Sequence, residues 1–136
     1  MTDKELLLTA IEAREKAYAP YSNHKVGAAL VGKSGKVYTG ANIESASFTP
    51  TVCAERVAFF SAIHSGETEF LKIAIVGGRN GVIDAFCPPC GVCRQVMREF
   101  CEDDFMLYLV DEKGYEAHTL AEVLPFSFSA KKHMQA

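Results

Sequence analysis

A chain of 136 residues has the length of one ordinary domain, and its 49% hydrophobic and 23% charged residues are typical of a folded globular protein. The formal net charge of −3, with lysines and arginines scattered along the chain, argues against a sequence-independent grip on nucleic acid, which needs clustered basic residues. We therefore expect a single domain over residues 1–136 and no nucleic-acid partner.

The chain has no pattern typical of membrane insertion or secretion. No stretch approaches the roughly 20 apolar residues that a membrane-spanning helix requires. Charged residues flank residues 6–8, so the N-terminus lacks the uninterrupted apolar core of a signal peptide. We expect a cytoplasmic protein without a membrane partner. Thiols stay reduced in the cytosol, so the five cysteines favour metal binding or catalysis over a disulfide framework.

The first elements in chain order are a helix and a β-hairpin. Thr2 and Glu5 fit a capping box, apolar residues follow at helical spacing, and the helix should end before Pro20. Residues 26–31 and 36–39 predict two strands, and the short polar segment between them contains a glycine that suits a turn.

Helices and apolar strands alternate in the rest of the chain. Residues 70–76 form a nearly continuous apolar run, typical of a strand buried on both faces. The order of elements predicts an α/β fold, a three-layer α/β/α sandwich whose mixed five-stranded sheet carries helices on both faces. The elements expected after the hairpin are a helix over residues 53–64, a strand over 70–76, a helix over 91–102, strands over 105–110 and 115–118, and a short helix capped by Thr119.

Two short segments concentrate the reactive side chains: Cys-Ala-Glu at residues 53–55 and Pro-Cys-Gly-Val-Cys at residues 89–93. Cys53, Cys90 and Cys93 all stand at predicted helix starts, where free backbone N–H groups lower the pKa of a thiol. Three thiolates could therefore face one point. Three protein ligands leave the fourth tetrahedral position of a zinc ion to water, as in a catalytic rather than a structural site.

Glu55 lies two residues beyond Cys53, near the predicted metal but poorly placed to bind it together with Cys53. A carboxylate beside a zinc ion that activates water can accept a proton from the water and deliver it to a leaving group. Three thiolates overcompensate the charge of Zn²⁺. We therefore expect Arg56 and Arg94 to donate hydrogen bonds to thiolate sulfur, which would restore the acidity of the water.

Simpler interpretations exist for several of these cysteines. The pair Cys90 and Cys93 alone could be a redox pair, although the upstream Cys-Ala-Glu and the preceding proline favour metal binding. Cys87 precedes Cys90 by three residues and could in principle be a ligand; we interpret it as structural. Cys101 fits a core position on the helix. The four histidines show no ligand spacing with one another.

The chain resembles the cytidine deaminase family, specifically its short, homotetrameric, three-cysteine members. Cysteine or histidine, then glutamate, then Pro-Cys-x-x-Cys is the known signature of zinc deaminases. The resemblance implies the family's fold, one Zn²⁺ per subunit and the hydrolytic deamination of cytidine and deoxycytidine in pyrimidine salvage. The matching segments cover nearly the whole chain: AYAPYS at 17–22, VGAAL at 26–30, GANIE at 40–44, CAER at 53–56, PCGVCRQ at 89–95 and LPFSF at 124–128.

At the metal, the resemblance implies that Cys53, Cys90 and Cys93 hold zinc. Glu55 would carry protons to N3 of the pyrimidine and to the departing ammonia. The backbone of Ala54 would contact the edge of the pyrimidine.

At the substrate, the resemblance implies that Asn42 and Glu44 bind ribose hydroxyls; they are two residues apart and so face the same side of a strand. His24 stands where many relatives carry an aromatic residue against the ribose. Phe128 of a neighbouring subunit would pack on the base, so that the homotetramer completes each active site. From composition alone, Asn42 and Glu44 could equally be a solvated strand end, and Phe128 a core or interface residue. The sequence of residues 47–52 differs from the one that the family usually has before its first zinc cysteine.

Two other functions stay open. One is a deaminase of a modified cytosine nucleoside such as blasticidin S, although residues 18–22 and 42–44 favour cytidine. The other is a non-catalytic protein in which zinc only stabilises the fold. Glu55 argues against this second function, because a structural site has no use for that carboxylate and usually supplies a fourth cysteine or histidine.

Overall fold

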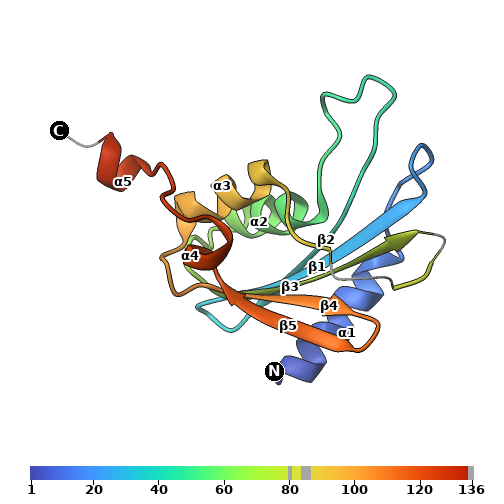
Figure 1. The fold of residues 1–136 in the computed structure, drawn as a ribbon, viewed down its shortest axis with the longest axis horizontal. Helices are drawn as coiled ribbons and strands as arrows, with labels where there is room; N and C mark the ends of the chain where they lie inside the picture. Colours follow the sequence, from blue (N-terminus) through green and yellow to red (C-terminus); the bar gives the residue numbers. More distant parts are fainter. Residues whose placement is uncertain (80, 84–86, 135–136) are drawn as a thin grey trace.

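The computed structural model describes residues 1–79, 81–83 and 87–134, and its centre is a five-stranded sheet with the order β2-β1-β3-β4-β5 (Figure 1). The pair β3–β4 is parallel, and the pairs β1–β2, β1–β3 and β4–β5 are antiparallel. The predicted mixed sheet is therefore confirmed. Its strands are β1 (His24–Gly32), β2 (Val37–Ala41), β3 (Phe70–Arg79), β4 (Met106–Asp111) and β5 (Gly114–Thr119).

Helices cover both faces of this sheet, as predicted. Side chains alternate between the faces of a strand. On β1, Ala29 and Val31 pack in the cluster that includes residues of α1, whereas Ala28 and Leu30 pack in the larger cluster with α2 and α3. Figure 1 shows α1 on one face of the sheet and α2 and α3 on the other. The helices are α1 (Asp3–Arg14), α2 (Ala54–His64), α3 (Gly91–Phe100), α4 (Leu120–Val123) and α5 (Ala130–His133).

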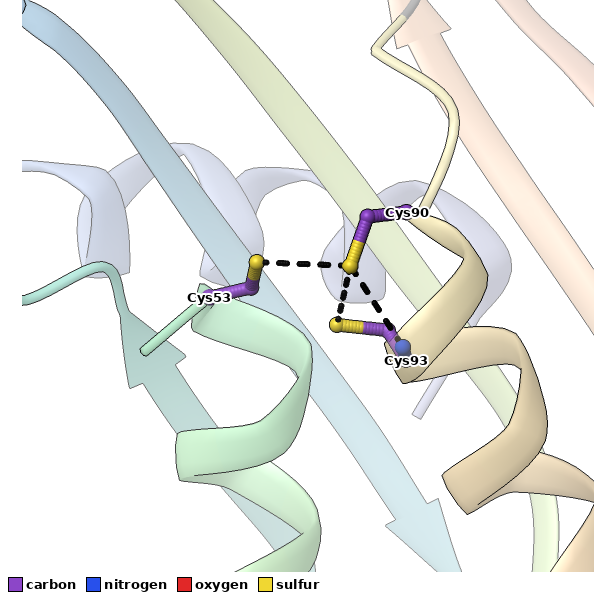
Figure 2. A group of neighbouring side chains, drawn as sticks. All are labelled: Cys53, Cys90 and Cys93. Carbon is purple, nitrogen blue, oxygen red and sulfur yellow. Dashed lines mark hydrogen bonds between the residues drawn. The ribbon is translucent and has the colours of Figure 1, made fainter. Parts of the chain in front are cut away.

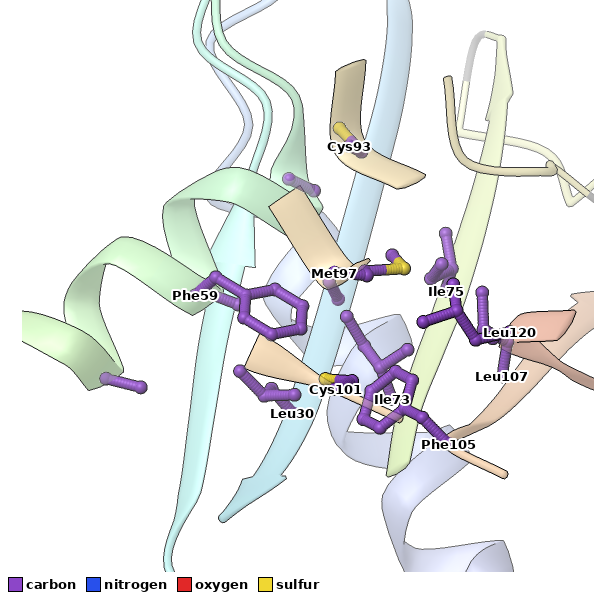
Figure 3. Packing of buried hydrophobic residues seen from close by; sticks show 14 of the residues in the cluster. Leu30, Phe59, Ile73, Ile75, Cys93, Met97, Cys101, Phe105, Leu107 and Leu120 are labelled. Carbon is purple, nitrogen blue, oxygen red and sulfur yellow. The ribbon is translucent and has the colours of Figure 1, made fainter. Parts of the chain in front are cut away.

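The larger cluster holds α2 and α3 against the same face of the sheet. Phe59 of α2, Met97 of α3 and Ile73 of β3 are fully buried within it (Figure 3). Burying such a side chain stabilises the fold by roughly 1.5–3 kcal/mol. This packing fixes the two helices relative to each other and brings their first residues together.

A close backbone approach sets the position of α2 on the sheet. A Cβ atom added to Gly40 of β2 would lie only 2.6 Å from the backbone nitrogen of Ala58 and would also collide with the carbonyl oxygen of Ala54. Only glycine allows β2 and α2 to lie this close.

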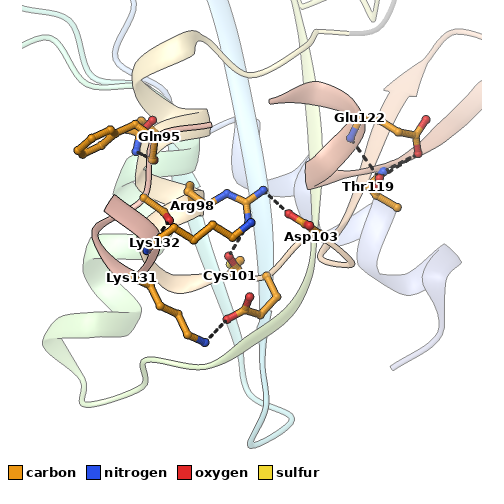
Figure 4. Close-up of polar contacts among 11 residues, drawn as sticks. Gln95, Arg98, Cys101, Asp103, Thr119, Glu122, Lys131 and Lys132 are labelled. Carbon is orange, nitrogen blue, oxygen red and sulfur yellow. Dashed lines mark hydrogen bonds and ion pairs between the residues drawn. The ribbon is translucent and has the colours of Figure 1, made fainter. Parts of the chain in front are cut away.

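The structure differs from the predicted elements mainly at their ends and near the C-terminus. The capping box of Thr2 and Glu5 is present, but α1 ends at Arg14, well before Pro20. The predicted helix α4 forms with a second capping box, of Thr119 and Glu122 (Figure 4). No element was predicted where α5 forms. None of the helices in the described residues is long and apolar enough to cross a membrane.

Candidate active site

The sulfur atoms of three cysteines converge where α2 and α3 begin (Figure 2). Cys53 and Cys90 are the N-cap residues of α2 and α3, and Cys93 lies in the first turn of α3. The Sγ atom of Cys90 is 3.6 Å from that of Cys53 and 3.3 Å from that of Cys93. All three sulfurs lie within 4.8 Å of one another, and no other such group of potential metal ligands occurs among the described residues.

This cluster fits a zinc ion. Zn–S bonds of about 2.3 Å in a tetrahedral site put the sulfurs roughly 3.8 Å apart, close to the spacing observed here. The hydrogen bonds made by Cys93 and Arg56 lower the pKa of Cys53 to about 5, despite its partial burial. One thiolate is therefore already favoured at neutral pH, and soft thiolates are ligands that zinc prefers.

Glu55 places a buried carboxyl group in the first turn of α2. The residue is only 3% exposed, and its Oε1 atom has no hydrogen-bond partner among the described residues. Burial raises the pKa of Glu55 to about 7, and the nearby charge of Cys53 adds to the rise. A buried polar atom without a hydrogen-bond partner lowers the stability of the fold, so its presence here indicates a site that binds a ligand. A pKa near neutrality suits a residue that both accepts and donates protons.

The two arginines predicted to donate to sulfur have different hydrogen-bond partners. Arg56 Nη2 lies 3.5 Å from Cys53 Sγ and donates to it. The prediction for Arg94 was wrong: its Nε donates to the carbonyl oxygen of Pro89 at 2.7 Å and its Nη1 to that of Val123 at 2.6 Å. Val123 is the last residue of α4, where carbonyl oxygens have no partner within the helix. Arg94 donates a hydrogen bond to this carbonyl oxygen and thereby links α4 to the loop before α3.

Asn42 and Glu44 are held by the start of β1 and by the loop before it. Asn42 Oδ1 accepts from the backbone nitrogen of Val26 at 2.8 Å, and its Nδ2 donates to the carbonyl oxygen of His24 at 2.9 Å. The carboxylate of Glu44 accepts from the hydroxyl of Ser22, which lowers the pKa of Glu44, and from the backbone nitrogen of Tyr21.

Glu44 also lines a pocket. The open pocket of about 230 Å³ is lined by Glu44 and its neighbours Tyr21, Ser22, Phe48 and Thr51. Two of these, Phe48 and Thr51, belong to the stretch over residues 47–52 that departs from the expected pattern. Phe48 meets Tyr21 edge to face, with ring centroids 6.1 Å apart. The unusual stretch over residues 47–52 therefore lies beside Glu44, a predicted substrate-binding residue.

Sequence reasoning missed a contact between Cys87 and His24. The Sγ atom of Cys87 lies 3.8 Å from Nε2 of His24, although the two residues are 63 positions apart. Cys87 was interpreted as merely structural, and no spacing in the sequence could have signalled this contact.

Phe128 lies in the segment between α4 and α5. Its ring stacks on that of His133 with centroids 5.0 Å apart, and 56% of the residue is exposed. Gln95 of α3 donates to its carbonyl oxygen at 2.8 Å, which attaches the segment to α3, and Lys131 of α5 pairs with Glu102, just beyond the end of α3 (Figure 4).

Comparison with known proteins assigns the family. Residues 1–109 match the cytidine and deoxycytidylate deaminase zinc-binding region. The chain belongs to this deaminase family. It is 43% identical to the cytidine deaminase of Sporosarcina psychrophila, over 95% of this chain and 93% of that protein. It is 46% identical to the cytidine deaminase of Halalkalibacterium halodurans, over 95% of this chain and 96% of that protein.

Solved structures of the family superpose closely on this deaminase. The crystal structure of cytidine deaminase from Burkholderia pseudomallei gives a TM-score of 0.86 at 44% identity, covering 94% of this chain and all of that one. That from Mycobacterium tuberculosis gives 0.79 at 32% identity, covering 94% and 98%. The predicted family, fold and zinc cofactor are confirmed, while the roles of individual residues stay predictions.

Proposed function

We propose that this deaminase hydrolyses the exocyclic amine of cytidine and deoxycytidine. Water and the nucleoside give uridine or deoxyuridine and ammonia. The observation that carries the proposal is the buried carboxyl group of Glu55, with an unpaired oxygen, beside three converging cysteine sulfurs. A site that only stabilised the fold would have no use for this group.

In the proposed mechanism, Cys53, Cys90 and Cys93 would hold the zinc ion, which would supply a water acidic enough to react at neutral pH. Glu55 accepts a proton from the attacking water and passes it to N3 of the pyrimidine. The oxygen of that water bonds to C4. Glu55 then takes the remaining proton of the C4 hydroxyl and delivers it to the exocyclic amine. The C4–N bond breaks, the C4 oxygen becomes the carbonyl of the product, and ammonia leaves. Arg56 draws negative charge from the sulfur of Cys53 through its hydrogen bond.

We propose that Asn42, Glu44 and His24 bind the sugar and that the backbone of Ala54 contacts the base. Three observations support this. Ala54 immediately follows Cys53 at the start of α2. Asn42 is bonded to the backbone of His24, so these two groups lie side by side. Glu44 is held as a carboxylate by the loop before β1, and a carboxylate can accept hydrogen bonds from ribose hydroxyls.

The decisive experiment is an ultraviolet assay of cytidine conversion by the zinc-loaded protein and its Glu55→Gln variant. General acid–base catalysis is typically worth about 10²–10⁴-fold, so we expect turnover to fall at least that far while zinc content is unchanged. Glu69→Gln is the matched control, since Glu69 is an exposed carboxylate paired with Lys33. A folded, zinc-bound wild type that leaves cytidine untouched would overturn the substrate. A fully active Glu55→Gln variant would overturn the role of Glu55.

We further propose a homotetramer in which Phe128 of one subunit packs on the base bound by another. Two observations support this. Phe128 is an aromatic residue with 56% exposure, and Phe60, Val92 and Val96 line an open, mostly apolar groove of about 550 Å³. Such surfaces are typical of interfaces.

Mixing of subunits tests this arrangement. Glu55→Gln and Phe128→Ala subunits should each be weakly active alone. Mixed tetramers should regain activity, because some sites then combine an intact Glu55 with an intact Phe128 from a neighbour. A wild-type protein that sediments as a monomer and is fully active would contradict the proposal. So would mixed tetramers, shown to contain both variants, that do not recover activity.

We also propose that the enzyme acts in the cytoplasm, in pyrimidine salvage. All five cysteines are free thiols, as a reducing compartment and a thiolate metal site both require. Activity recovered only from secreted or membrane fractions of its host would refute this location.

A further inference from the structure

Three residues from separate parts of the chain meet at the start of β1. The Sγ atom of Cys87 lies 3.8 Å from Nε2 of His24. A Cβ atom added to Gly77 of β3 would be 3.0 Å from Cys87 Sγ and 3.2 Å from His24 Nε2. The missing side chain of Gly77 therefore leaves the space in which Cys87 and His24 touch.

This contact is on the same face of the sheet as the metal cluster. His24 belongs to the row of β1 that continues with Val26, Ala28 and Leu30, the residues that pack beneath α2 and α3. Cys87 packs against that same cluster. The negative charges of Glu55 and Cys53 also act on Cys87, so the pair lies near the catalytic carboxyl group.

The chemistry of the pair gives the hydrogen bond a direction. Burial raises the pKa of Cys87 to about 11, so this side chain is a protonated thiol at neutral pH. A neutral imidazole has one nitrogen that accepts and one that donates. When the thiol donates to Nε2, that nitrogen is the acceptor and Nδ1 carries the proton. His24 is then held in one tautomer and one ring orientation.

We propose that Cys87 is a positioning residue that holds His24 with its Nδ1–H group directed to an oxygen of the nucleoside sugar. The inference rests on the proposed function, because His24 acts on the sugar only if the substrate is a nucleoside. His24 supplies a donor at this position, so the sugar-binding part of the pocket recognises a hydroxyl or ether oxygen. Cys87 itself touches no substrate.

The tautomer can be measured without turnover. Nitrogen–proton correlation spectra of the zinc-loaded protein, with the His24 signals assigned from a His24→Gln variant, should show the Nδ1-protonated neutral form. In Cys87→Ala this pattern should be lost, and in Cys87→Ser, which keeps a donor, it should be retained. An unchanged His24 pattern in folded Cys87→Ala, or an imidazolium in the wild type at neutral pH, would overturn the proposal.

Kinetics then test whether the pair serves the sugar. Loss of a neutral hydrogen bond should raise the KM of Cys87→Ala for cytidine roughly 3- to 10-fold with kcat nearly unchanged, because the contact is the same in ground and transition states. In a His24→Phe background, Cys87→Ala should add nothing, whereas a merely structural effect would persist. Cys101→Ala, which removes a buried thiol at the far end of α3, is the control and should leave KM unchanged.

The two proposals fail in different ways. If the wild type does not deaminate cytidine, the proposed function fails whatever the tautomer of His24. If the wild type is active and KM of Cys87→Ala equals that of the wild type, the positioning role fails while the deaminase assignment stands.

Discussion

The guanidinium group of Arg56 lies 3.5 Å from the sulfur of Cys53, the residue that precedes α2. Three positions separate them, which on a helix brings side chains to the same side. The hydrogen bond pairs a permanent positive charge with the sulfur and, after the bond from Cys93, is a further cause of the lowered pKa of Cys53. The first turn of α2 and its N-cap residue thus bring together a proposed metal ligand, the proposed proton carrier Glu55 and a positive partner for the sulfur of Cys53.

We predict that Arg56→Gln lowers kcat about 10- to 100-fold while zinc stays bound, because a thiolate without its donor makes the metal a weaker acid. Arg94→Gln is the matched variant. Its guanidinium bonds two backbone carbonyls, so its loss should lower stability by about 1–3 kcal/mol in thermal unfolding. Zinc content, kcat and Tm are measured for both. The opposite pattern, with Arg94 controlling kcat and Arg56 only Tm, would show that the roles are reversed.

Removal of zinc should lower both stability and activity. The three sulfurs of the cluster come from the starts of two different helices, so an ion bound there links α2 to α3. A ligand present at 100 times its Kd stabilises the native state by about 2.7 kcal/mol. Chelated protein should therefore unfold several degrees lower in calorimetry, and added zinc should restore Tm and turnover together. An unchanged Tm in protein proven free of metal would speak against this link.

Gly40→Ala should destabilise the protein and impair the site. The new methyl group would meet the backbone of Ala54 and Ala58, which cannot move without shifting α2. Overpacking of this kind typically costs about 1–3 kcal/mol. In Gly91→Ala the added Cβ meets no atom within 4 Å, so Tm should hardly change. Equal Tm values for the two variants would indicate that α2 does not lie as close to β2 as described.

Glu67 should contribute stability that is lost in acid. Its carboxylate accepts from the hydroxyl and backbone nitrogen of Ser34, with the hydroxyl contact the main cause of a pKa below the ordinary value of 4.5. Because the folded pKa is the lower one, this stability is fully present above the unfolded pKa and disappears as pH falls through the folded pKa. The difference in unfolding free energy between wild type and Glu67→Gln should be constant above about pH 5.5 and shrink below 4.5. A difference that grows in acid would contradict this sign.

Much of the fold and the metal site could be predicted because their signals are local. The capping box at Thr2 and the cap at Thr119 formed as the residue types indicated, since a cap satisfies backbone groups only three residues away. The apolar run that became β3 needed only its own composition. The three cysteines could be identified because thiolates at two helix starts, with a glutamate beside one, form a chemical pattern that few other arrangements share.

Contacts between distant segments depended on the tertiary structure. Arg94 was expected to reach a sulfur, but the packing of α4 beside α3 offers it an unpaired carbonyl oxygen at Val123. Cys87 meets His24 because β3 lies beside β1 with a glycine at position 77. The sequence by itself determined which groups are able to hold zinc or carry a proton, since the chemistry of a thiol or a carboxyl group belongs to the residue type; the shifted pKa values of Cys53 and Glu55 came from the fold. Only the packed fold decided which neighbour each polar group finds, because that depends on the distances left between elements once the core is closed.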